Sequence, residues 1–102
     1  MRTIKTREKG YKDYGFEPGE EKRLIQYCRS TEFDRNQELL ISSISANATF
    51  ANDIYYSIVK DISFDALNKI KYIPVSKNDF YAYRRKALAN MRNWLIFHNV
   101  KY

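Results

Sequence analysis

The sequence contains few of the residues that build metal sites, disulfide frameworks and loop-rich folds. Its 102 residues include one cysteine, one histidine, three glycines and two prolines. A lone cysteine, Cys28, excludes an internal disulfide and fits a reducing compartment such as the cytoplasm. With His98 as the single histidine, one chain cannot assemble a Cys/His metal site. The sequence therefore predicts neither a metal nor a cofactor.

Long apolar runs and catalytic motifs are missing as well. No segment approaches the roughly 20 apolar residues of a membrane span, and the charged N-terminus lacks the apolar core of a signal peptide. There is no Gly-rich phosphate loop, nucleophile elbow or helix with metal-ligand spacing. The carboxylates of Glu17, Glu20 and Glu21 are explained by the positive end of a helix dipole. We expect a cytoplasmic protein with no membrane partner, no enzyme activity and no catalytic residue.

The little glycine and proline, together with 44% hydrophobic residues, favours a folded helical protein. Its length fits a single domain. Residues 1–15 mix glycine with charge and lack periodicity, which indicates a flexible basic arm. Residues 16–102 should form one compact all-α bundle of about five helices, ending in a helix-turn-helix at 63–97 with a long C-terminal helix.

Three helices are expected before residue 63. The first should begin near Pro18, with acidic residues in its first turn. Its buried residues should be Leu24, Tyr27 and Cys28. The second should begin at an Asp34 cap, with Gln37 in capping-box spacing. Its buried residues should be Leu40, Ile41 and Ile44. The third is marked by apolar residues at helical spacing, namely Ile54, Tyr55, Ile58, Val59 and Ile62.

Two capped helices should follow, separated by a tight connection. Ser63 can cap a short helix, whose inward residues should be Leu67 and Ile70. Pro74 forbids its continuation. Ser76 then caps the last helix, with Asp79 three residues on. The inward stripe of this helix should be Phe80, Tyr83, Ala87, Leu88, Met91, Trp94 and Leu95.

Charge is distributed unevenly along the chain. Residues 1–12 hold five basic residues and one acidic residue, residues 13–65 hold five basic and ten acidic residues, and residues 66–102 hold eight basic residues and one acidic residue. The ends are thus basic and the middle is acidic. This asymmetry predicts that one end faces a polyanion while the middle has a separate task.

The last helix should present its basic face away from the core. Arg reads guanine, Asn reads adenine, and Lys and Tyr hold phosphates. In a helix-turn-helix the first turns of the second helix enter the major groove, and the backbone N–H groups beside Ser76 suit a phosphate. Base discrimination should come from Asn78, Tyr81 and Arg85. The complete set of predicted DNA-binding residues is Lys69, Lys71, Ser76, Lys77, Asn78, Tyr81, Arg85 and Lys86.

The segment "ISFDALNKIKYIPVSKNDFYAYRRKALANM" resembles the region-4-like helix-turn-helix of sigma factors and of phage late-transcription regulators of the RinA/ArpU kind. The residues that carry the resemblance are Ser76, Phe80, Tyr81, Arg84, Arg85, Ala87 and Leu88, with Leu67 and Ile70 before them. Residues 11–28 also resemble the start of small proteins of clostridial-type prophages. The usual turn glycine is absent, and the connection, which contains Pro74, is about two residues longer than usual. The resemblance implies a phage-type transcription regulator that binds duplex DNA.

Other functions fit the same features. In a regulator, the acidic middle helices would meet RNA polymerase, a host protein or a second copy in a homodimer. The chain could instead be a helical protein-interaction module of a phage, whose basic face meets an acidic host protein. A third option is a DNA-packaging factor like the terminase small subunits, which oligomerise. Arg84 falls within the apolar stripe, so we expect it to extend to the edge of the core or to pair with an acid.

Overall fold

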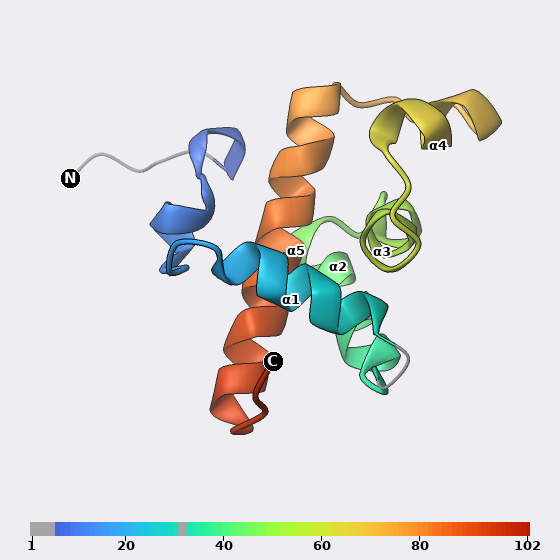
Figure 1. Ribbon diagram of the computed structural model, residues 1–102. Coiled ribbons are helices and arrows are strands. Elements are labelled where there is room, and N and C mark those ends of the chain that lie inside the picture. The colour runs from blue at the N-terminus through green and yellow to red at the C-terminus, as the bar shows by residue number, and fades with distance from the viewer. Residues whose placement is uncertain (1–5, 31–32) are drawn as a thin grey trace.

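A computed structural model describes residues 6–30 and 33–102, and this part of the chain is helical throughout, without strands. Two 3-10 helices, η1 (Thr6–Glu8) and η2 (Tyr11–Tyr14), precede the α-helices (Figure 1). The α-helices are α1 (Glu20–Arg29), α2 (Asn36–Ala46), α3 (Ala51–Val59), α4 (Phe64–Ile70) and α5 (Lys77–Phe97). The predicted all-α class with about five helices is confirmed.

The long helix α5 is the axis of the molecule, and the other elements pack around it (Figure 1). No glycine or proline interrupts it. The predicted stripe is confirmed, with Phe80, Ala87, Leu88, Met91 and Leu95 buried and Tyr83 and Trp94 half-buried. Ala82 and Ala89 are buried as well, because neighbours cover α5 on more than one side.

The helix α2 buries a different face from the one predicted. Ile41 and Ile44 are 56% and 48% exposed, and Leu40 is half-buried. The buried residues are Leu39, Ser42, Ser43 and Ala46. α2 lies against α5, and small buried side chains let the two helices approach closely. The buried hydroxyl of Ser43 is satisfied by donating to the Leu39 carbonyl at 2.9 Å.

The predicted Asp34 cap is also wrong. α2 begins at Asn36, its N-cap is Arg35, and no side chain caps it. Phe33 is buried and packs edge-on against Tyr27, with ring centroids 5.2 Å apart. This contact fixes where the chain turns, so the carboxylate of Asp34 stays outside and pairs with Arg35 at 3.7 Å.

The first helix follows the sequence prediction closely. Leu24 and Cys28 are buried, and Tyr27 is half-buried. Gly19, with φ of 79°, provides the left-handed turn that starts α1. Burial raises the pKa of the Cys28 thiol to about 12, so the thiol stays protonated at neutral pH.

Residues 1–5 of the expected basic arm lie outside the described residues. Residues 6–15, assigned to the same arm, instead form the turns of η1 and η2, which contact α5. The sequence did not predict these two 3-10 helices, because they are too short to show an apolar periodicity and because glycine and charged residues at these positions are also typical of a flexible segment. In the part of the chain that the structure describes, no helix combines the length and apolar character needed to cross a membrane.

Candidate nucleic-acid interface

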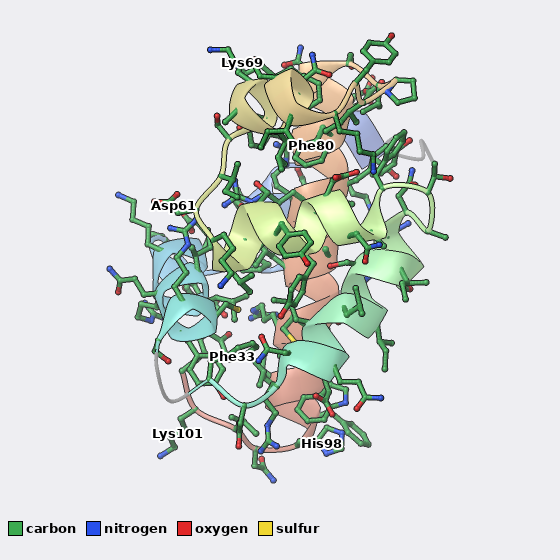
Figure 2. The ribbon with its side chains drawn as sticks, turned by 90° about the vertical axis from the view of Figure 1, so that its right-hand side faces the viewer. Phe33, Asp61, Lys69, Phe80, His98 and Lys101 are labelled. Carbon is green, nitrogen blue, oxygen red and sulfur yellow. The ribbon has the colours of Figure 1, made fainter. Side chains whose placement is uncertain are left out.

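The corner formed by α4, its connection to α5 and the start of α5 contains most of the predicted DNA-binding residues. Both helices begin at the predicted serine caps. The Ser63 hydroxyl accepts from the Ala66 backbone N–H at 3.2 Å, and the Ser76 hydroxyl accepts from the Asp79 backbone N–H at 3.1 Å. Figure 2 shows Lys69 on α4 at one end of the molecule, with Phe80 below it.

Aromatic packing fixes α4 against α5. The rings of Phe64 and Phe80 lie 5.3 Å apart, and both side chains are buried. The hydroxyl of Tyr81 accepts a hydrogen bond of 3.1 Å from the Phe64 backbone N–H. That N–H lies in the first turn of α4, where helices leave backbone donors without partners. The two helices therefore form one rigid corner.

Five of the eight predicted residues are exposed at this corner, namely Lys69, Lys71, Ser76, Lys77 and Asn78. Two of the lysines have acidic neighbours. Lys77 Nζ donates to Asp65 at 2.9 Å, and this hydrogen bond, together with the charge attraction, raises the Lys77 pKa. Lys71 Nζ lies 3.7 Å from Asp53. The side chains of Lys71 and Lys77 are nevertheless 70% and 55% exposed.

The other three predicted residues, Tyr81, Arg85 and Lys86, are half-buried. On this outward face, Tyr81 and Arg85 are engaged in contacts with neighbouring segments. Tyr81 is drawn inward by its hydrogen bond to α4 and its edge contact with Phe80, at 5.7 Å between centroids. The physical reason is that α5 is packed on several sides, so a single inward stripe does not define its whole buried surface.

Arg85 connects α5 to the N-terminal segment. Its Nε donates to the Lys9 carbonyl at 2.9 Å, and the Lys9 ammonium lies 5.2 Å from the ring centre of Tyr14. The turns of η1 and η2 thus flank the same helix that carries Lys77 and Asn78, and Figure 1 shows them on the opposite side of α5 from α4. Residues 6–14, the described part of the N-terminal basic segment, therefore pack against this helix.

The sequence analysis did not predict that two large apolar residues of the corner are exposed. Ile70 is 81% exposed and Tyr72 is 77% exposed. The prediction that Ile70 faces inward is wrong, because Ile73, 2% exposed, occupies the core position instead. The Asn68 side chain accepts from the Ile73 backbone N–H at 2.8 Å and holds this reversal of the chain. The proline after Ile73 was the available signal that the chain turns back there.

The corner therefore combines cations, an amide and exposed apolar groups on a rigid support. Phosphate contacts, base-edge hydrogen bonds and apolar contacts with bases need these groups.

Comparisons of the chain with family models, with curated proteins and with solved structures gave no match.

The histidine and the acidic group noted in the sequence lie outside this corner. Within the described ranges, no group of three or more His, Cys, Asp or Glu side chains could hold a metal ion. His98 stacks on Trp94, with centroids 4.0 Å apart, at the end of α5. The buried carboxylate of Glu20, in the acidic group at the start of α1, accepts hydrogen bonds from Arg92 and Tyr102. These contacts give the carboxylate a structural role.

Proposed function

We propose that this chain is a small DNA-binding regulator of the phage or prophage type, which docks the corner of α4 and α5 on duplex DNA. The observation that carries the proposal is the exposure of Lys69, Lys71 and Asn78 beside a serine-capped helix start. The convergence of the N-terminal basic segment on the same helix supports it further. In this proposal the lysines supply salt-dependent affinity through phosphates, and Asn78 reads a base edge.

The contacts of individual residues support different roles for them in this proposal. Asn78 and Lys69 are exposed, whereas Lys71 and Lys77 would contact phosphates from beside Asp53 and Asp65. Arg85 has its Nε committed to Lys9, although a guanidinium retains further donors for a phosphate. Tyr81 acts as a support, since its hydroxyl holds α4.

The test is binding to a labelled generic duplex across a salt series. The double variant Lys69→Gln/Lys71→Gln should lower the slope of log affinity against log salt by about 1.8, since each phosphate contact contributes about 0.9. Lys60→Gln/Lys101→Gln is the matched control, because it removes the same net charge from exposed residues outside the corner. Figure 2 shows Lys101 at the other end of the molecule from Lys69. Equal losses in both variants would refute the interface, and so would the absence of binding by the native chain at low salt.

A second candidate is a helical protein-interaction module. It is favoured by exposed apolar residues away from the corner, with Ile41 and Ile44 on α2 and Ile96 and Phe97 at the end of α5. A second copy of the chain is the partner that fits a helix-turn-helix regulator, because such units commonly bind paired half-sites as dimers. Sedimentation velocity of the native chain and of Ile41→Asp tests this. A dimer lost in the variant supports the apolar interface, a ring-sized assembly favours the terminase-like role, and a monomer removes both.

A further inference from the structure

A second charged site lies in the middle of the molecule, outside the corner of α4 and α5. A cleft of about 330 Å³ opens between α1, the turn that ends α3, and α5. Its lining residues are Lys22, Ile25, Gln26, Arg29, Asp61 and Arg84. Figure 2 shows Asp61 on the side of the molecule where α1 lies. The predicted function uses none of these side chains.

Arg84 is the unusual member of this group. It is half-buried, and its Nε is buried without a hydrogen-bond partner. Its guanidinium lies 5.7 Å from the ring centre of Tyr81. Because the guanidinium is partly buried, its cation is poorly solvated and the Arg84 pKa is lowered. Of the two arrangements expected for Arg84, extension to the edge of the core is the one found, since Arg84 lines this cleft and no ion pair involving it is present in the described structure.

The single acid of the cleft is already engaged. Asp61 pairs with an Nη of Arg29 at 3.1 Å. The Nε of Arg29 donates to the Ile58 carbonyl at 2.7 Å, which holds the guanidinium in place. With Asp61 neutralised by Arg29, the positive charges of Lys22 and Arg84 remain in a cleft that has no other carboxylate among its lining residues.

We propose that this cleft binds the phosphate group of a small anion, with Arg84 and Lys22 as its principal donors. A phosphate monoester carries about −1.5 to −2 charges at neutral pH, which matches the two cations left uncompensated. Its three acceptor oxygens suit the planar fork of a guanidinium, which binds phosphate with paired hydrogen bonds. The amide of Gln26 can orient the bound group. The proposal does not depend on DNA binding by the corner.

The test follows the Arg84 Nε–Hε signal of the intact protein by NMR, with Arg84→Lys used to assign it. Inorganic phosphate is titrated against sodium chloride of equal ionic strength, and adenosine monophosphate is titrated separately. A saturable shift with phosphate indicates that the group alone is recognised. A saturable shift only with the nucleotide indicates that the phosphate is bound as an ester. Either supports the site, whereas shifts no larger than those with chloride overturn it.

Substitutions at two exposed residues of α1 distinguish binding in the cleft from general charge attraction, and they leave the core unchanged. Lys22→Gln should weaken phosphate binding about fivefold to tenfold, because it removes a charge-assisted hydrogen bond. Arg23→Gln is the matched control, since Arg23 is exposed and does not line the cleft. Equal effects of the two substitutions would show general charge attraction and overturn the site.

Discussion

Arg92 donates a hydrogen bond of 2.6 Å from Nε to Glu20 Oε2, although 72 positions separate the two residues in the sequence. Their side chains are 18% and 6% exposed. The Tyr102 hydroxyl donates to the same carboxylate oxygen, and Arg92 also donates to the Gly15 carbonyl at 3.1 Å. The pair thus fastens α1, the end of η2 and the last residue of the chain to α5.

Loss of this carboxylate should destabilise the fold at neutral pH. Burial alone would raise the Glu20 pKa, but hydrogen bonds from Arg92, Tyr102 and the Glu17 backbone lower it from 4.5 to about 2. The resulting stabilisation is present above pH 4.5 and is lost as the pH falls towards 2. Glu20→Gln should lower the free energy of unfolding at pH 7 by about 3 kcal/mol. Urea denaturation of the native chain and of Glu20→Gln measures this difference in the free energy of unfolding.

The same experiment includes a pH comparison and a control. Between pH 4.5 and 2 the unfolding free energy of Glu20→Gln should change less with pH than that of the native chain, because the shifted carboxyl group is gone. Glu17→Gln removes an exposed carboxylate from the same turn and should cost little. An unchanged pH slope in Glu20→Gln would contradict the assignment.

Arg85 should hold the N-terminal turns in place. Arg85→Gln removes the 2.9 Å hydrogen bond to the Lys9 carbonyl, at a cost of about 1–2 kcal/mol. Amide hydrogen exchange in residues 9–16 should accelerate more than exchange in α3, because only the former segment is tethered by this bond. Lys86→Gln, one position along, serves as control. Uniform acceleration along the whole chain would indicate global destabilisation instead.

The start of α3 should depend on Asn47. Its side-chain oxygen accepts from the backbone N–H groups of Thr49 at 3.0 Å and Phe50 at 3.2 Å. Asn47→Ala should therefore lower the free energy of unfolding by about 1 kcal/mol. Asn52→Ala, at an exposed position within the helix, should be neutral or slightly stabilising. Thermal melts of the two variants compare them, and equal losses would disprove a role for the Asn47 side chain in this turn.

If the corner of α4 and α5 binds DNA, Tyr72 should add a non-ionic contact. Tyr72→Ala should weaken duplex binding about fivefold and leave the salt dependence unchanged, because no phosphate contact is lost. The fold should be unaffected, since the side chain is 77% exposed. Tyr56→Ala changes another exposed tyrosine, on α3. Anisotropy titrations at two salt concentrations compare them, and a matching effect of Tyr56→Ala would count against the contact.

Local signals in the sequence predicted the helices well. The caps at Ser63 and Ser76 depend on a hydroxyl and a backbone N–H three residues away, so the sequence pattern contains the whole interaction. The stripe of α5 follows from the helical period alone. The buried face of α2 did not follow from apolar spacing, because its contact with α5 buries the small residues Ser42 and Ser43 while Ile44 stays exposed.

In the candidate sites, too, local sequence signals predicted some features, and tertiary packing determined the others. Exposed residues at the start of α5, such as Lys77 and Asn78, were placed correctly from the cap and the helical period. The bond between Arg85 and Lys9 spans 76 positions, and no local pattern indicates it. The cleft around Arg84 requires three separate elements to meet, so only the tertiary packing brings its cations together.

The burial of Cys28 has a practical consequence. Because the chain's single thiol is buried and its pKa is raised to about 12, thiol reagents at neutral pH should react with it only when the protein opens. The alkylation rate of Cys28 therefore reports how often the protein opens. A cysteine introduced at the exposed Asn78 would be the one fast-reacting label, so a dye can be attached at the corner without first removing the native sulfhydryl.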